Sequence, residues 1–358
     1  MTGYSSDLKG LVQFAESLIE EQTQVSQQQA YTILQNRADI LFGNLHKEYQ
    51  DELQGFIDHY TALDPSISAA DIKITNFFAD IALPTSCSSY AAWGNKTLDG
   101  KTLFGRNLDF ADPNLSIHHS YAVITIKEQG KSFTQIGSLL MPFSNLTLFS
   151  KTLSLSALIA NIGEPLSVTS GSYALGYAYR DAIEHSDTLA GAKKILNRYQ
   201  YTWGSLTAVA TPQRSAILED AMGYDRDYRY YNSVLNSDIE PKFNSGYQQI
   251  AAVNTFMLPE NPLYFYSRLS LLQLDNQTRW QEFYQRTNNN HPETEQNVMN
   301  LMDYHKADIA GSTTDIYNHE TLLSVIYRFG SKYAWVAFNS DKVNPDQMKY
   351  QKVSLFTR

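Results

Sequence analysis

The sequence predicts an α+β protein in which a helical N-terminal quarter precedes a layered domain of antiparallel sheets covered by helices. Two observations lead to this prediction. Apolar residues recur at helical spacing as far as Phe78, and from Cys87 onward they alternate with the period of two that is typical of strands. After Cys87 the expected elements follow in the order strands, two helices, strands, helices and strands, which fits sheets with helices packed on their outer faces.

Residues 1–86 are expected to form several helices. Apolar spacing predicts helices near 11–19, 31–45 and 53–60, and Ser68 with Asp71 forms a capping-box pattern that starts another. This segment carries a net charge of −8, whereas the other 272 residues carry −1. Such asymmetry indicates a boundary close to Cys87. The simplest interpretation of the charge is that the acids lie on solvated helix faces.

A β-hairpin is predicted directly after the boundary. Residues 87–93 form the first strand, Asp99-Gly100 is a strong turn signal, and residues 101–107 return. If those two residues form the whole turn, Trp93 lies opposite Arg106. Arg106 then shares a face with Cys87, subject to any β-bulge.

The rest of the chain continues the same alternation. A Thr211-Pro212 turn and a Gly330-Ser331 turn indicate two further hairpins, and the acidic, tyrosine-rich residues 220–238 are expected to be irregular. The expected strands are 121–127, 134–137, 153–162, 206–210, 216–219, one reaching Asn254, 322–327 and 333–338, and the expected helices are 173–184, 188–198, 280–286 and 294–302.

Composition excludes several classes of protein. The chain has 358 residues, 43% of them apolar, which is enough for a large core, and its net charge of −9 argues against a nucleic-acid partner. A single cysteine excludes a disulfide framework and any multi-cysteine metal site. The sequence has neither an 18-residue apolar run nor a signal-peptide pattern at its start. The chain is therefore expected to be made without a signal or to begin after its removal, and the compartment stays open.

Cys87 is the starting point for the chemistry. A lone cysteine is most often a small buried hydrophobe, and the eight histidines show no motif of a cysteine–histidine hydrolase. A different base exists if the chain is cut before Cys87. The freed α-amine has a pKa of about 7.7–8, so it can accept the thiol proton near neutral pH.

The residues that follow Cys87 carry a family pattern. It consists of Cys87-Ser88, Gly94, Asp99-Gly100 and the run from Gly105 to Asp109, and it resembles the N-terminal-nucleophile cysteine hydrolases. This superfamily includes choloylglycine hydrolases, acid ceramidase, the N-acylethanolamine-hydrolysing acid amidase and the acyl-coenzyme A:6-aminopenicillanate acyltransferase-like peptidases. The sequence around Cys87 resembles the acyltransferase-like peptidases most closely. Weaker resemblances occur at residues 48–55, 252–254, 268 and 321–325.

The resemblance implies a four-layer αββα sandwich at 87–358, preceded by a helical propeptide at 1–86 that is cut between Ser86 and Cys87. It implies Cys87 as nucleophile, Arg106 and Asp109 as the pair that positions it and lowers its pKa, and Asn254 as an oxyanion donor, with backbone N–H groups near Trp93 as further donors. Arg268 would brace the site or bind substrate. The chain departs from the family at Val253-Asn254-Thr255, where Thr-Asn-His is frequent, and at Phe110, where Trp or Tyr is frequent.

The implied function is a self-cleaving amidase that hydrolyses a non-peptide linear C–N amide, such as an N-acyl or lipid amide, through a thioester. Two alternatives stay open: acyl transfer to an amine at the same site, and a catalytically idle relative that binds acyl amides or lipids. No metal or organic cofactor is implied. The expected partners are the small amide substrate and the cleaved propeptide, with contact to a lipid surface and the oligomeric state left open. If the acids of 1–86 lie against the larger part, acid is expected to loosen that contact and speed the cut.

Overall fold

The computed structural model describes residues 4–82, 85–110, 120–128, 131–160, 168–220, 226–259, 261, 273–306, 315–338 and 348–356. The N-terminal part is helical, as expected. Capping boxes start two of its helices: at Ser26 with Gln29, and at Ser68 with Asp71, the pair predicted from the sequence. The helices are α1 (Ser5–Thr23), α2 (Gln27–Asn44), α3 (Lys47–Leu63), α4 (Ala69–Asn76) and α5 (Phe78–Ile81).

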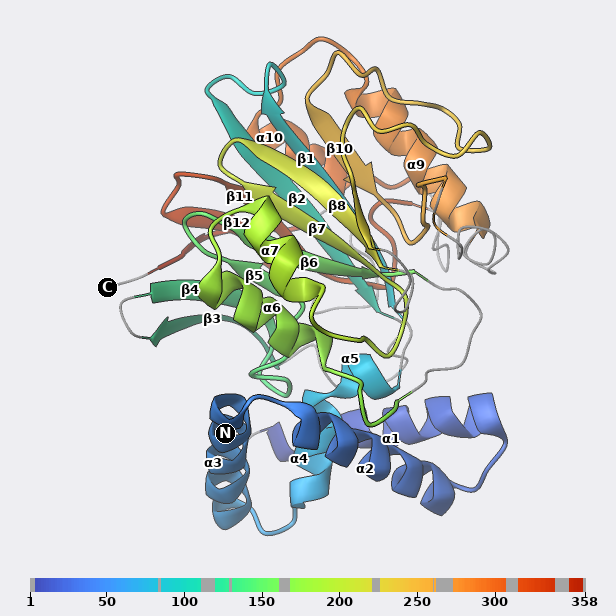
Figure 1. The fold of residues 1–358 in the computed structure, drawn as a ribbon, viewed down its shortest axis with the longest axis vertical. Coiled ribbons are helices and arrows are strands. Elements are labelled where there is room, and N and C mark those ends of the chain that lie inside the picture. Colours follow the sequence, from blue (N-terminus) through green and yellow to red (C-terminus); the bar gives the residue numbers. More distant parts are fainter. Residues whose placement is uncertain are drawn as a thin grey trace.

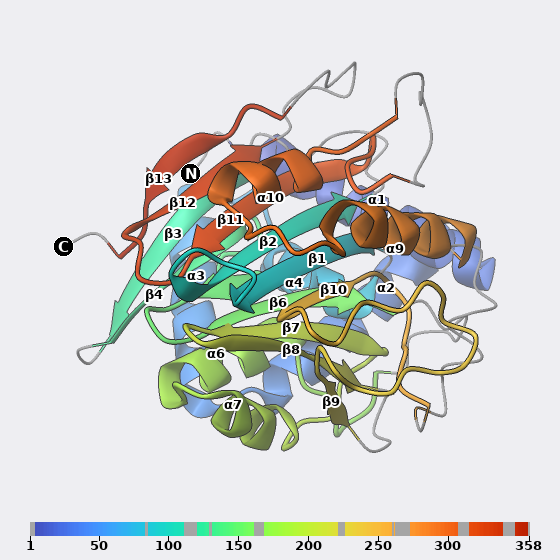
Figure 2. The same ribbon diagram turned by 90° about the horizontal axis from the view of Figure 1, so that it is seen from above.

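Two antiparallel sheets follow (Figures 1 and 2). The first has the order β10-β1-β2-β11-β12-β13, built from β1 (Thr85–Gly94), β2 (Gly100–Phe110), β10 (Gln249–Ala252), β11 (Thr321–Arg328), β12 (Tyr333–Phe338) and β13 (Gln351–Ser354). The second has the order β3-β4-β5-β6-β7-β8-β9, built from β3 (Tyr121–Glu128), β4 (Lys131–Ser138), β5 (Thr147–Phe149), β6 (Ser154–Ile159), β7 (Ser205–Thr211), β8 (Arg214–Asp220) and β9 (Asp227–Arg229).

The sheets pack face to face between two helical layers. Side chains such as Phe104 of the first sheet and Phe149 of the second form the core between them. Helices α6 (Leu175–His185) and α7 (Leu189–Leu196) cover the second sheet, and α9 (Gln273–Thr287) and α10 (Glu295–Met302) cover the first (Figures 1 and 2). The α+β, αββα architecture expected from the sequence is confirmed, with the N-terminal helices before it.

The N-terminal helices do not form a separate core. Apolar residues of α1 to α5 join one continuous cluster with those of α6, α7 and the outer face of the second sheet. Polar contacts reinforce this interface: Glu52 of α3 forms an ion pair with buried Arg180 of α6, and Tyr49 donates to Glu184 at 2.6 Å. Figure 1 shows the helical segment lying against one end of the sandwich.

The β1–β2 hairpin has a different register from the one predicted. Ser89, not Trp93, lies opposite Arg106, because residues 95–99 all belong to the connection and the register shifts between Ala92 and Gly94. The difference between the two registers is an even number of residues, so the faces are unchanged. Cys87 and Arg106 therefore share the inner face of the sheet.

Within the described ranges, no helix is both long and apolar enough to cross a bilayer.

The stretch expected to be irregular, 220–238, contains the end of β8 and the short strand β9, which pairs with β8.

Candidate active site

Cys87 lies near the start of β1, which is next to the edge of the first sheet and has β10 on one side and β2 on the other. Its side chain is 1% exposed and packs on the inner face, among apolar residues of both sheets. Ser86, on the other side of the predicted cleavage site, is in register with Asp109 of β2. The bond expected to be cut thus lies in a regular strand. Polar groups of β2, of α9 and of the segment that follows β10 lie next to it.

Arg106 lies beside the thiol. Its Nη2 is 3.6 Å from Cys87 Sγ and donates to the Ala157 carbonyl of β6 at 2.8 Å. The guanidinium is 1% exposed, and its Nε has no hydrogen-bond partner among the described residues. A buried guanidinium at this distance favours the thiolate over the neutral thiol.

Asn254 contacts the backbone of the predicted nucleophile. Its Oδ1 accepts from the Cys87 backbone N–H at 2.8 Å, and its Nδ2 donates to the Ile159 carbonyl at 2.6 Å. The side-chain amide that we expected as an oxyanion donor is thus bound to β6 in this state of the chain. The carbonyl end of Asn254 is the part that faces Cys87.

Arg279 of α9 is part of the site and was not predicted. It is fully buried; its Nη1 donates to the Cys87 carbonyl at 2.9 Å and its Nη2 donates to Asn254 Oδ1 at 3.0 Å. Asn276, one turn earlier, accepts from Arg279 at 2.8 Å and also bonds the Asn254 backbone. Arg268, which we expected to brace the site, lies outside the described residues.

The sequence contained a signal for Arg279 that the predicted helix boundary hid. A helix beginning at Trp280 leaves Arg279 in a loop, whereas α9 begins at Gln273. In the longer helix Asn276, Arg279, Trp280 and Phe283 recur at spacings of three and four, so they share one buried face. Two polar residues on such a face indicate a buried site.

Asp109 lies on the other face of the sheet from Arg106, because the two residues are three positions apart along β2. Its charged partner in the described part of the chain is Arg279, at 3.6 Å. Thr321 donates to Asp109 at 2.6 Å and Asn318 donates at 3.4 Å. Asp109 and Arg106 thus bracket Cys87 from two sides of the sheet instead of pairing directly.

Burial shifts both charges of the Asp109–Arg279 pair toward their neutral forms. It raises the pKa of Asp109 to about 6, although Arg279 and the Thr321 hydroxyl oppose the shift. Burial likewise lowers the pKa of Arg279, and Asp109 opposes that change. Asp109 is therefore a carboxyl group that can exchange a proton close to neutral pH.

Within the described ranges, no three His, Cys, Asp or Glu side chains are grouped so that they could hold a metal ion. The site consists instead of a thiol, two guanidinium groups, a carboxyl group and two carboxamides. These groups suit acyl transfer through a cysteine.

The likeness of this chain to known proteins is structural. No family model and no curated protein matches the sequence. Among solved structures, the chain is similar to a Caenorhabditis elegans N-acylethanolamine-hydrolyzing acid amidase (NAAA) ortholog, with a TM-score of 0.47 and 14% sequence identity over 68% of this chain and 94% of that chain.

Proposed function

We propose that this chain is a self-cleaving cysteine amidase of the N-terminal-nucleophile type, with Cys87 as the nucleophile of both reactions. The observation that carries the proposal is the set of contacts around one residue. The Sγ, backbone N–H and carbonyl of Cys87 each contact a different buried polar side chain, namely Arg106, Asn254 and Arg279. A structural cysteine does not need such an environment.

In the first reaction, Cys87 Sγ attacks the carbonyl carbon of Ser86. The acyl group moves from the Cys87 nitrogen to sulfur, which breaks the peptide bond and forms a thioester with a free α-amine. Water then hydrolyses the thioester, so that residues 1–86 end in a carboxylate and Cys87 becomes an N-terminus. Arg106, next to Sγ, stabilises the attacking thiolate.

In the second reaction, the freed α-amine acts as the base. It occupies the position of the Cys87 N–H, 2.8 Å from Asn254 Oδ1, and this contact orients it. The amine takes the thiol proton, the thiolate attacks the substrate amide, and the leaving amine receives the proton. The resulting thioester is hydrolysed by water. Arg279 positions Asn254 and the Cys87 carbonyl and balances the Asp109 charge.

The substrate that we propose is a non-peptide linear amide, such as an N-acyl amide. An acyltransferase would use the same thioester and differ only in the nucleophile that intercepts it. A catalytically idle relative would keep the fold without a reactive thiol. Both alternatives are outcomes of the experiment below.

The experiment is intact-mass analysis of the purified chain after incubation between pH 4 and pH 8. We expect fragments of residues 1–86 and 87–358, with Cys87 at the new N-terminus, and no cut in Cys87→Ala. The matched control Ser88→Ala, which changes the neighbouring residue on the opposite face of β1, should still be cut. The cut chain should then be tested on N-acyl amides with water alone or with added amines, which separates hydrolysis from transfer.

Two results would contradict the proposal. The first is full amidase activity in a chain that keeps its mass of 40.6 kDa at every pH. The second is a Cys87 thiol that an acyl-mimicking electrophile does not label in the cut chain, which would favour the idle relative.

A further inference from the structure

The segment that follows β10 and carries Asn254 is buried, although it has no regular secondary structure. From Val253 to Leu258, no residue is more than 9% exposed. Backbone N–H groups in such a segment need acceptors, because a buried donor without one is unfavourable. The groups that supply these acceptors therefore determine where Asn254 lies.

Glu219 of β8, a strand of the second sheet, supplies acceptors to this segment. The Met257 N–H lies 3.1 Å from its Oε1 and 2.9 Å from its Oε2, and the Leu258 N–H donates to Oε2 at 3.1 Å. The Glu219 side chain is 1% exposed. One buried carboxylate thus binds two successive backbone donors, and this fixes both the position and the direction of the chain there.

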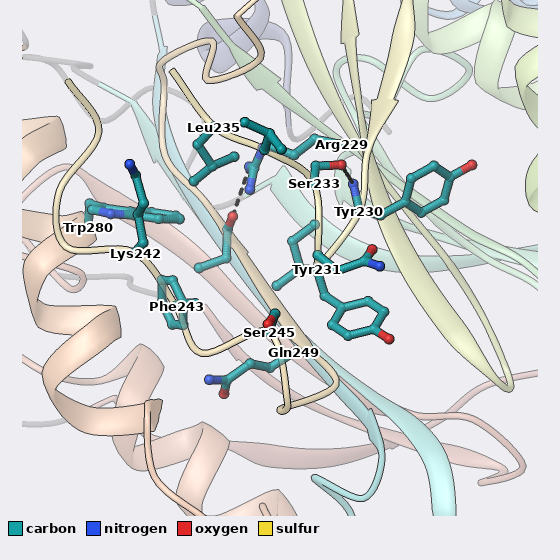
Figure 3. A pocket seen from close by; sticks show the side chains of 14 residues that line it. Arg229, Tyr230, Tyr231, Ser233, Leu235, Lys242, Phe243, Ser245, Gln249 and Trp280 are labelled. Carbon is teal, nitrogen blue, oxygen red and sulfur yellow. Dashed lines mark hydrogen bonds between the residues drawn. The ribbon is translucent and has the colours of Figure 1, made fainter. Parts of the chain in front are cut away.

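Arg229 of β9 balances the charge of Glu219 and adds a second contact. Its Nε donates to Glu219 Oε1 at 3.0 Å. Its Nη2 donates to the Ala251 carbonyl of β10 at 2.9 Å, a contact drawn as a dashed line in Figure 3. The ion pair therefore holds the backbone three residues before Asn254, at Ala251, and three residues after it, at Met257.

The geometry of Asn254 depends on where this backbone lies. On the α9 side, Asn276 accepts from the Asn254 N–H at 3.1 Å, and Arg279 donates to Asn254 Oδ1 at 3.0 Å. The same Oδ1 accepts from the Cys87 N–H at 2.8 Å. A shift of the backbone on the Glu219 side would lengthen both contacts of Oδ1.

We propose that Glu219 is a positioning residue for the reaction at Cys87, because it holds the backbone that places Asn254 Oδ1 against the Cys87 N–H. This inference rests on the proposed function, since it concerns the same reaction. The hydrogen bonds of Glu219 in the described part of the chain go to Met257, Leu258 and Arg229, so it acts through Asn254 and not on the thiol.

The first test is the rate of the cut in Glu219→Gln, followed on denaturing gels. A carboxamide keeps the size of the side chain but offers one acceptor oxygen where the carboxylate offers two, so we expect the cut to slow by about tenfold or more. Glu293→Gln is the matched control. It makes the same change in another buried ion pair, with Lys96 at 3.3 Å, at the other end of β1 from Cys87, and should be cut at the wild-type rate.

The outcomes separate this inference from the proposed function. A wild-type chain that is never cut contradicts the proposed function. A wild-type chain that is cut no faster than Glu219→Gln overturns the positioning role alone. If Glu219→Gln does not fold because Arg229 loses its partner, the double variant Glu219→Gln/Arg229→Gln, which removes both charges, decides in the same way.

A double-mutant cycle with Asn254→Ala distinguishes positioning from a general loss of stability. Without the carboxamide there is nothing for Glu219 to position, so Glu219→Gln should change the cutting rate of Asn254→Ala by no more than about twofold. Two effects that multiply would show that Glu219 acts independently of Asn254, and this would overturn the proposal.

Amide hydrogen exchange in the uncut Cys87→Ala background tests the same contact without the reaction. Glu219→Gln should speed exchange of the residue 87 amide, relative to that of Ser89 in the same strand, by about tenfold or more, because Asn254 Oδ1 is its acceptor. Glu293→Gln should leave this ratio unchanged. An unchanged ratio in Glu219→Gln would overturn the proposal even if Asn254→Ala is cut too slowly to measure.

Discussion

Replacing Asp80 by asparagine is expected to stabilise the uncut chain at pH 8 and to change little at pH 4. Asp80 lies in α5 and is 1% exposed. Its Oδ1 accepts from the Leu175 N–H at the start of α6 at 3.0 Å, while its Oδ2 has no hydrogen-bond partner among the described residues. Burial raises the pKa of Asp80 to about 7, and the Leu175 hydrogen bond only partly opposes this.

The direction in which the free energy of unfolding changes with pH follows from proton binding. Because the pKa of Asp80 is higher in the folded chain than its ordinary value of 3.8, the folded chain binds more protons between about pH 4 and pH 7. The free energy of unfolding therefore falls as pH rises through this window, by about 4 kcal/mol for a pKa difference of this size. Asparagine keeps the acceptor without the charge. The pKa of about 7 already includes the hydrogen bond from Leu175, so the expected gain at pH 8 is about 4 kcal/mol.

Urea unfolding at pH 4.5, 6 and 8 measures this effect, with Cys87→Ala as the background so that no cut intervenes. Asp58→Asn, at an exposed position of α3, is the matched control and should shift stability by less than about 0.5 kcal/mol. A loss of stability in Asp80→Asn at pH 8, or an equal gain at pH 4.5 and pH 8, would refute the reasoning. The expected result also limits the idea that acid loosens the helical segment, because Asp80 acts in the opposite direction.

Three further predictions concern the other buried charges. Arg279→Met should lower the free energy of unfolding by about 3–5 kcal/mol at pH 8, because Asp109 loses its partner, and by less at pH 4.5, where Asp109 is protonated; urea unfolding checks both values. Arg106→Gln should slow the cut about 10²-fold without preventing folding, as followed on denaturing gels, and an unchanged rate would exclude a role beside the thiol. Glu52→Gln should cost about 1–2 kcal/mol in thermal unfolding, because buried Arg180 keeps only one carboxylate.

The hairpin shows what the sequence could and could not predict. The alternation of apolar residues placed Cys87 and Arg106 on one face of the sheet. This prediction holds for every register that differs by an even number of residues. The register was wrong because Asp99-Gly100 is a turn signal that does not reveal how many residues precede it in the connection. Here the connection holds residues 95–99, with Gly94 and Gly100 both at positive φ. The exact register also involves the pairing of β1 with β10 and of β2 with β11, which the hairpin sequence does not contain.

The site residues also divide into those that the sequence could predict and those that it could not. Cys87, Arg106, Asp109 and Asn254 come from short motifs that a sequence displays directly. Arg279 comes from a helix whose first turns are polar, so the apolar pattern began late and hid it. The pairing of Asp109 with Arg279 joins β2 to α9 across 170 residues of chain, and no local pattern predicts such a contact.

The shared core of the helical segment and the sandwich has a consequence for what a cut at Ser86–Cys87 would produce. Because the apolar faces of α1 to α5 are buried against α6, α7 and the second sheet, breaking one peptide bond would not release the first 86 residues. The product would be a two-chain heterodimer, and its halves would part only on unfolding or extreme dilution. Gel filtration under native conditions should then give one peak that denaturing electrophoresis resolves into two bands. In such a protein the N-terminal fragment would remain a subunit of the mature molecule.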